Sequence, residues 1–372
     1  MSKRIDIVAG ARPNFMKIAP IIRALEMRIA AGGSLGYRLI HTGQHYDAQM
    51  SGDFFGQLGI PAPHLNLEVG SGTQAGQTAA IMTRYEEVLL EARCDLCMVV
   101  GDVTSTMACA ITAQKLGIPV AHVEGGIRSG DWSMPEEINR MVTDAITDFF
   151  FTTSETANAN LRRSGVPEGR IFFVGNTMID TLLHHLPQLR PPAFWDEFRL
   201  VPRRFLVLTL HRPANVDAGE RLVSLLTAVS EAARDYLVVF PVHPRTRRQL
   251  TGLGLPPVAR AIRFVDPQGY LEFNYLVRDA AAVITDSGGI TEEATVMGVP
   301  CLSLRDTTER PETITIGTNE LIGTDPSRVK PALDRVFAGT WKKGGVPPLW
   351  DGKTSERIVG HLERLLSGGR DA

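Results

Sequence analysis

Residues 281–293, AAVITDSGGITEE, decide how the chain is interpreted. A short β-branched run closed by the letters DSGG is typical of a buried strand that turns directly into a helix. We expect this helix to begin at Ser287 or Gly288, with Glu292 and Glu293 in its first turn, where acids complement the helix dipole. Glycine leaves the backbone N–H groups of a helix start open to an anion, so the stretch predicts a phosphate-binding turn.

A loop dense in polar groups follows within about one strand–helix unit. It covers residues 305–312, RDTTERPE, directly after the apolar run at 299–304. Taken alone, a Ser-Gly-Gly turn is more often an ordinary strand-to-helix connection. Because an Arg- and Thr-rich loop follows so closely, the anion site becomes the favoured interpretation, with Arg310 among its cations.

Length and charge limit the class of protein. At 372 residues the chain is long enough for two domains with separate cores. The net charge of −2 argues against a nucleic-acid surface and against a polybasic membrane contact. No apolar run reaches the ~18 residues of a membrane span. The N-terminus runs straight into a first strand, so we expect a cytoplasmic protein.

The four cysteines include one CxxC spacing, at Cys94 and Cys97. No second CxxC or nearby His pair completes a metal site, and Cys97 begins a buried-strand pattern. We therefore interpret these cysteines, and Cys301, as small core residues. Neither HExxH, GxxxxGK[ST] nor a suitably placed DxD pair is present, so we expect no metal and no cofactor.

Strand patterns alternate with helical periodicity along the whole chain, which predicts doubly wound parallel sheets and an α/β fold class. We place an N-terminal Rossmann-like domain at residues 1–183 and a second at 184–354, after the Pro-rich stretch 184–204. The amphipathic segment 355–372 is expected to pack back on the first domain. Two such domains facing each other would form a cleft, a common ligand site.

Acidic side chains follow successive predicted strands, where open α/β sheets bind ligands. Asp102 and Glu124 end two neighbouring strand patterns, and Glu136 begins a helix. A single acid in this position often just caps a helix, but two equivalent acids favour a shared site suited to proton transfer. His211 ends the first strand of the second half. A lone histidine there is more often structural, and only the wider setting favours a functional role.

Two cations follow the first predicted strand. Arg12 lies in its turn and Lys17 comes about one helical turn later, so both can face the same crevice. The spacing fits a solvated surface pair equally well. The chain lacks GxGxxG, so a dinucleotide site has no support.

At these residues the chain resembles the non-hydrolysing UDP-N-acetylglucosamine 2-epimerases. The matching stretches run in order along most of the chain: GARP at 10–13 with Lys17, TGQH at 42–45, Gly101-Asp102, Val123-Glu124, PEEINR at 135–140, Gly175-Asn176, His211-Arg212, TDSGGI at 285–290 and RDTTERPE at 305–312.

The resemblance implies a two-domain fold of the glycosyltransferase-B type, a homodimer, and interconversion of UDP-GlcNAc and UDP-ManNAc by elimination and re-addition of UDP. It also implies roles for residues of this chain. The catalytic ones would be Asp102, Glu124, Glu136 and His211. The substrate-binding ones would be Arg12, Lys17, Gln268 and Phe273 (uracil), Ser287, Gly288, Gly289, Glu293 (ribose) and Arg310.

Rival interpretations stay open at this point. A 2-epimerase of a related sugar, such as UDP-2,3-diacetamido-glucuronate, would want a further cation, for which Arg128 or Arg140 would serve. A transferase of the same fold would need an acceptor, and a hydrolysing relative would release free sugar. A non-catalytic sensor would have no use for three acids at the sugar end.

The chain departs from family members that are regulated by a second UDP-GlcNAc. Those members carry a Gln shortly after the position of Gln44 and an Arg farther on. Here Asp47 stands at the first position, and the stretch VGSG at 69–72 offers no evident Arg. We therefore expect this regulatory site to be absent or altered.

Overall fold

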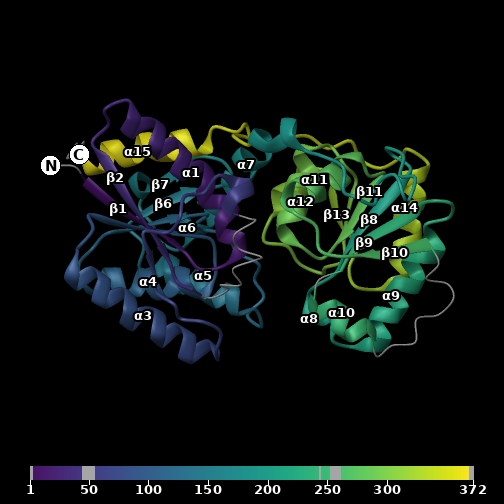
Figure 1. Ribbon diagram of the computed structural model, residues 1–372, viewed down its shortest axis with the longest axis horizontal. Helices are drawn as coiled ribbons and strands as arrows, with labels where there is room; N and C mark the ends of the chain where they lie inside the picture. Colours follow the sequence, from purple (N-terminus) through teal and green to yellow (C-terminus); the bar gives the residue numbers. More distant parts are fainter. Residues whose placement is uncertain (1–2, 44–54, 243, 252–260, 368–372) are drawn as a thin grey trace. The chain divides into compact units, whose positions relative to one another are not determined.

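The computed structural model describes residues 3–43, 55–242, 244–251 and 261–367. It divides into two compact units (Figure 1). Unit 1 comprises Met1–His184 and Pro348–Ala372, and unit 2 comprises His185–Pro347. Each unit is built on one parallel sheet with helices packed against it, which confirms the predicted α/β class.

Within the described residues, unit 1 has a seven-stranded sheet in the order β3-β2-β1-β4-β5-β6-β7. Its strands are β1 (Lys3–Ala9), β2 (Leu35–His41), β3 (Leu65–Asn66), β4 (Leu96–Val100), β5 (Val120–Val123), β6 (Phe149–Thr152) and β7 (Ile171–Phe173). Its α-helices are α1 (Arg12–Ala30), α3 (Gln74–Glu91), α4 (Thr104–Lys115), α5 (Pro135–Ala145), α6 (Glu155–Arg163), α7 (Thr177–His185) and α15 (Thr354–Leu366), and η1 (Glu168–Arg170) is a 3-10 turn. The strand order reverses between β1 and β4, which makes this the switch point of the sheet.

Unit 2 repeats the architecture in the order β10-β9-β8-β11-β12-β13, again within the described residues. Its strands are β8 (Phe205–Thr209), β9 (Leu237–Pro241), β10 (Ile262–Val265), β11 (Ala282–Thr285), β12 (Cys301–Ser303) and β13 (Asn319–Leu321). Its helices are α8 (Pro213–Val216), α9 (Gly219–Ala232), α10 (Pro244–Thr251), α11 (Tyr270–Asp279), α12 (Gly288–Val296), α13 (Pro311–Thr315) and α14 (Val329–Phe337), with 3-10 turns η2 (Leu186–Gln188) and η4 (Pro326–Arg328). Its switch point lies between β8 and β11.

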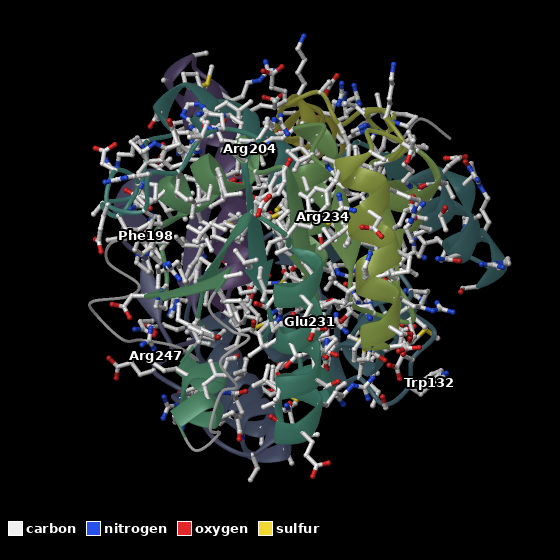
Figure 2. All side chains as sticks on the ribbon, turned by 90° about the vertical axis from the view of Figure 1, so that its right-hand side faces the viewer. Trp132, Phe198, Arg204, Glu231, Arg234 and Arg247 are labelled. Carbon is white, nitrogen blue, oxygen red and sulfur yellow. The ribbon has the colours of Figure 1, made fainter. Side chains whose placement is uncertain are left out.

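Two cation–ring contacts cover the outer side of unit 2 where α9 and α14 pack together. The guanidinium of Arg234 lies 5.2 Å from the centre of the Phe337 ring, and that of Arg204 lies 5.1 Å from the Tyr236 ring. Figure 2 labels the two arginines. The two rings stack on each other at 4.5 Å. Long basic side chains thus cover apolar surface while their charged ends stay near water.

The alternation of strands and helices that was predicted from the sequence is confirmed. Helix α12 begins at Gly288 with Ser287 as its N-cap, also as predicted. The expectation that Glu292 and Glu293 lie in its first turn is wrong. The first turn is Gly-Gly-Ile-Thr, so both acids fall one turn later, where they are buried rather than placed at the positive end of the helix.

The four cysteines are free thiols in the core, which confirms their interpretation as core residues. Burial raises the pKa of Cys94 and of Cys301 to about 12. In the described part of the chain, no helix is both long and apolar enough to cross a membrane.

The last helix, α15, belongs to unit 1 and packs on α1 (Figure 1). Its N-terminal turn is held by the carboxylate of Asp180 on α7, a buried side chain. The backbone N–H groups of Thr354 and Ser355 donate to this carboxylate at 3.0 and 2.7 Å, and the Ser355 hydroxyl donates at 2.7 Å. Asp180 thus caps a helix that is distant in sequence.

Replacing Asp180 by Ala should loosen α15. Three donors would lose their acceptor, and a buried donor left unpaired costs about 1–3 kcal/mol. Hydrogen exchange measured by mass spectrometry should show faster exchange at α15, with the amides of unit 2 unchanged. Asp180→Asn keeps one acceptor oxygen, so the increase in exchange at α15 should be smaller than in Asp180→Ala. Unchanged exchange at α15 in Asp180→Ala would contradict this role.

Candidate functional site

The switch point of unit 1 begins with a tightly held turn between β1 and α1. The N–H groups of Gly10 and Ala11 both donate to Oδ1 of Asn14 at 3.1 Å, and Nδ2 of Asn14 donates to the Val100 carbonyl at 2.8 Å. A Cβ on Gly10 would lie 2.2 Å from the Ser105 hydroxyl oxygen, so only glycine fits there. Asn14 therefore joins the ends of β1 and β4, a role that the sequence analysis missed.

Lys17 and Glu124 form a buried ion pair beside this turn. The Lys17 Nζ lies 2.7 Å from Glu124 Oε2, and both residues are buried. Glu124 also has a φ of +73°, in the left-handed region that non-glycine residues rarely occupy. Such strain is often found at functional sites, where the surrounding structure enforces it. Among the two predicted cations only Lys17 is placed, because the Arg12 side chain lies outside the described part of the structure.

Asp102 is held at the end of β4, the strand adjacent to β5. Its carboxylate lies 2.5 Å from Nη1 of Arg140, and its carbonyl accepts from Nδ2 of Asn139 at 2.8 Å. The carboxylate side chain retains 32% exposure, so it is accessible to a ligand. The N–H of Gly101 donates to the Val123 carbonyl at 3.0 Å. The residues that precede Asp102 and Glu124 are therefore hydrogen-bonded to each other.

The PEEINR stretch supplies α5, and its two glutamates differ in environment. Glu136 is exposed in the first turn, whereas Glu137 is buried and binds Arg140. Burial raises the pKa of Glu137, but hydrogen bonds from the Ser129 and Gly130 amides and from Arg140 together hold it below its usual value. Arg140 thus links Glu137 to Asp102, a link that the motif contained but that the sequence analysis did not assign.

In unit 2, His211 lies at the end of β8 and is oriented by Asp286 from the end of β11. The His211 Nδ1 lies 2.9 Å from Oδ1 of Asp286, a fully buried carboxylate. The amides of His211 and Arg212 and the Asn215 side chain also donate to Asp286. Burial raises the pKa of Asp286, but these donors lower it below the usual value. The charged carboxylate fixes the ring so that Nε2 can act on a ligand.

The start of α12 follows β11 and comes directly after Asp286 in the sequence. The Ser287 amide donates to the Thr285 hydroxyl at 3.0 Å, and the Ser287 side chain makes no cap hydrogen bond. A Cβ on Gly288 would lie 2.5 Å from a carboxylate oxygen of Glu309, so a larger residue there would have to displace that side chain. Burial raises the pKa of Glu309, but pairing with Arg305 lowers it to about 2. The ionised Glu309 side chain therefore lies beside the α12 start, the turn that was predicted to bind an anion.

Arg310 is not exposed as a phosphate-binding cation would be. It is buried at the start of α13, and its Nε lies 2.6 Å from Oε1 of Glu292 on α12. Glu293, the next residue, is also buried, and Tyr270 and Asn274 of α11 hydrogen-bond to it. Burial raises the pKa of Glu293 to about 7.

The two residues expected at a uracil site flank the start of α11. The Gln268 side chain is partly buried and donates to the Asp266 carbonyl at 2.7 Å. Phe273 is partly buried and packs on a core cluster of unit 2. The structure thus gathers the predicted residues of unit 2 around β8, β11, α11 and α12. In unit 1, Lys17, Asp102 and Glu124 lie around β1, β4 and β5, whereas Glu136 is exposed on α5.

Two parallel α/β sheets, each with polar groups at its switch point, define a protein of the glycosyltransferase-B type. The chain belongs to the UDP-N-acetylglucosamine 2-epimerase family, whose model matches residues 27–363. A calicheamicin glycosyltransferase structure, 14% identical over the full length of both chains with a TM-score of 0.58, shares the fold alone.

Individual relatives are similar over nearly their whole length. The UDP-N-acetylglucosamine 2-epimerase of Methanocaldococcus jannaschii is 40% identical over 99% of this chain and 100% of its own. A crystal structure of the enzyme from that organism, in complex with UDP-GlcNAc and UDP, has a TM-score of 0.87 and covers 96% of this chain and 99% of that one. The UDP-2,3-diacetamido-2,3-dideoxy-D-glucuronate 2-epimerase of Pseudomonas aeruginosa is 36% identical over 97% of this chain and all of its own.

Replacing Lys17 by Met should destabilise unit 1 strongly. Removing one partner of a buried ion pair leaves an uncompensated charge and costs about 3–5 kcal/mol. The matched control is Lys3→Met, because Lys3 pairs with Asp95 at the surface, where a pair contributes about 0–1 kcal/mol. Urea unfolding of the full chain measures both. Adding Glu124→Gln to Lys17→Met should restore part of the loss, and equal effects of the two lysine changes would refute the assignment.

Stability of unit 2 should fall as pH rises from about 4.5 to about 7, because Glu293 stays protonated in the folded state and ionises in the unfolded chain. Glu293→Gln removes this contribution. Relative to wild type, the variant should therefore gain on the order of 3 kcal/mol across the window, at about 1.4 kcal/mol per pKa unit. Urea unfolding at several pH values measures the difference, and parallel pH profiles would contradict the prediction.

Proposed function

We propose that this protein interconverts UDP-GlcNAc and UDP-ManNAc. Support comes from the family and from relatives whose names state this activity. The observation that carries the proposal is the pair of carboxylates at adjacent strand ends of unit 1, each beside a cation: Asp102 with Arg140 and Glu124 with Lys17. A binding protein would gain nothing from acids at the sugar end, whereas an epimerase must move a proton there.

The proposed reaction does not form a free carbanion at C2 of the sugar. The C2 hydrogen of the sugar has no neighbouring carbonyl, so its carbanion would not be stabilised. In the elimination, a carboxylate takes the C2 proton while the C1–O bond breaks and its electron pair leaves with UDP. The product is a 2-acetamidoglucal with a C1–C2 double bond. UDP then adds back to C1, and a proton is delivered to the opposite face of C2.

The residues of unit 2 are assigned to the nucleotide. The Ser287 hydroxyl and the amides of Gly288 and Gly289 would hold the diphosphate, which gains negative charge as it departs. Glu293 would bind the ribose. The uracil would contact Gln268 and stack on Phe273. Arg310 would add positive charge next to α12, although its Nε already pairs with Glu292.

The proton transfers are assigned to Asp102, Glu124 and Glu136, with assistance from His211. The Asp286–His211 pair supports this role, because a buried carboxylate holds the ring in one orientation. Lys17 and Arg12 would contribute positive charge toward the diphosphate.

The Pseudomonas relative makes a uronate-containing sugar the second candidate substrate. A uronate needs a cation, and the two candidates from the sequence are both engaged by carboxylates. Arg128 lies 2.6 Å from Asp144, and Arg140 binds Asp102 and Glu137. This favours UDP-GlcNAc, and comparing kcat/KM for the two sugar nucleotides decides between them. We also propose a cytoplasmic homodimer, supported by the family resemblance and measurable by light scattering.

Incubation with UDP-GlcNAc in heavy water, followed by NMR, tests the reaction. The expected result is a manno product with deuterium at C2, because the proton returned after elimination comes from solvent. Steady release of free UDP would instead indicate hydrolysis. Absence of C2 exchange would contradict the proposal.

Asp102→Asn should lower kcat on the order of 100-fold or more, because the amide cannot accept the proton. The affinity for UDP should stay unchanged, since Asp102 is assigned to the sugar and not to the nucleotide. Asp95→Asn, at a surface ion pair of the same unit, is the control and should keep full activity. Rates and calorimetric UDP titrations measure the effects. A normal rate for Asp102→Asn would remove Asp102 from the mechanism.

A further inference from the structure

His122, in β5, is a buried histidine that lies between two hydrogen-bond acceptors. Its Nε2 lies 2.8 Å from the Gly101 carbonyl oxygen, and its Nδ1 lies 2.7 Å from Oδ1 of Asp144. A carbonyl oxygen only accepts, so Nε2 must carry a hydrogen. The state of Nδ1 then depends on Asp144.

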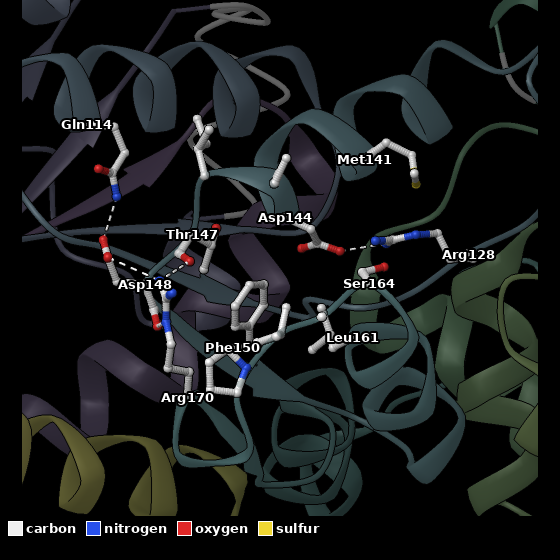
Figure 3. Close-up of a pocket in the computed structure, with 15 residues that line it drawn as sticks. Gln114, Arg128, Met141, Asp144, Thr147, Asp148, Phe150, Leu161, Ser164 and Arg170 are labelled. Atoms are coloured by element: carbon white, nitrogen blue, oxygen red, sulfur yellow. Dashed lines mark hydrogen bonds and ion pairs between the residues drawn. The ribbon is translucent and has the colours of Figure 1, made fainter. Parts of the chain in front are cut away.

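Asp144 is ionised. Burial raises its pKa, but hydrogen bonds and charge from His122 and Arg128 hold it below the usual value. Its second oxygen accepts from the Gly126 amide at 2.9 Å. It also accepts from Nη1 of Arg128 at 2.6 Å (Figure 3). Both nitrogens of His122 therefore face acceptors, and Asp144 holds the ring with Nε2 directed at the Gly101 carbonyl.

The group that His122 holds through Nε2 is the peptide bond that leads into Asp102. Since a peptide is planar, fixing the Gly101 carbonyl also fixes the direction in which the chain enters Asp102. Gly101 has a φ of +69°, and a Cβ there would lie 3.0 Å from Nζ of Lys17. The peptide therefore passes close to the Lys17–Glu124 pair.

Other hydrogen bonds hold the remaining backbone of the turn at Gly101 and Asp102. The Gly101 amide donates to Val123, and the Asp102 carbonyl accepts from Asn139. Neither of these bonds restrains the Gly101 carbonyl itself. That restraint comes from His122, which lies two residues before Glu124 on the adjacent strand.

We propose that His122, held by Asp144, is a positioning residue that sets the direction of Asp102 relative to Glu124. This inference rests on the proposed function, in which Asp102 and Glu124 handle the C2 proton. Stability alone does not require the arrangement, because well-packed apolar residues often replace a buried ion pair without loss. The rest of β5, Val120, Ala121 and Val123, is apolar core. A misplacement of about 1 Å at a reacting group can cost about 100-fold in rate.

The test compares two replacements of His122. His122→Gln keeps an N–H donor for the Gly101 carbonyl, whereas His122→Leu removes it. We expect His122→Leu to lower kcat about 100-fold with KM nearly unchanged, and His122→Gln to recover about tenfold of that loss. Asp144→Asn, which removes the charge that holds the ring, should lower kcat about tenfold, again with KM nearly unchanged.

The matched control is Arg38→Met. Arg38 forms a buried ion pair with Asp6 in the same sheet, at 2.7 Å, with no contact to the Gly101 turn. Its loss should destabilise unit 1 but leave kcat per folded molecule unchanged. The folded fraction is measured by near-UV circular dichroism. Dividing kcat by this fraction removes any effect that comes from unfolding alone.

Three results would overturn the inference: a kcat per folded molecule of His122→Leu within threefold of wild type, an equal loss in Arg38→Met, or no recovery in His122→Gln. If His122→Leu does not fold, unchanged kcat in both His122→Gln and Asp144→Asn has the same consequence. Wild-type protein without C2 exchange would refute the proposed function itself. Active wild type with normal His122 variants refutes only this inference.

Discussion

Parallel strands bring all their carboxyl ends to one edge of a sheet, and this constraint places the candidate site in each unit. At the switch point the two neighbouring connections leave in opposite directions, so the strand ends there are not covered by a shared helix. In unit 1 the edge carries the Gly10 and Gly101 turns with Glu124, and in unit 2 it carries His211 and the α12 start. Everything proposed about chemistry depends on this convergence.

Charged groups at these edges are held by partners from other elements. Glu124, directly after β5, is paired with Lys17 of α1, and Asp286 after β11 receives donors from the segment after β8. A buried carboxylate is tolerated only when such donors replace water. The same donors fix its direction, so the demand for stability and the demand for orientation are met by one set of hydrogen bonds.

Much of the fold and of the candidate site could be anticipated from residue patterns. The strand ends, the position of Asp102 and Glu124 on neighbouring strands, and the α12 start at Gly288 follow from local periodicity and turn chemistry. The burial of Glu292 and Glu293 could not be anticipated in this way. The sequence shows two acids near a helix start. It does not show that Arg310, at the start of α13, pairs with Glu292, or that Tyr270 of α11 hydrogen-bonds to Glu293.

Residues whose role depends on a distant partner escaped the sequence analysis altogether. Asp144 lies near the end of α5 and His122 inside an apolar strand, so each alone resembles an ordinary surface or core residue. Their pairing exists only because β5 and α5 pack together. The sequence by itself determined the α/β alternation and the sites at the strand ends, since these depend on neighbours within a few residues. Only the tertiary structure decided which charges pair, because ion pairs join side chains that the chain brings together after long excursions.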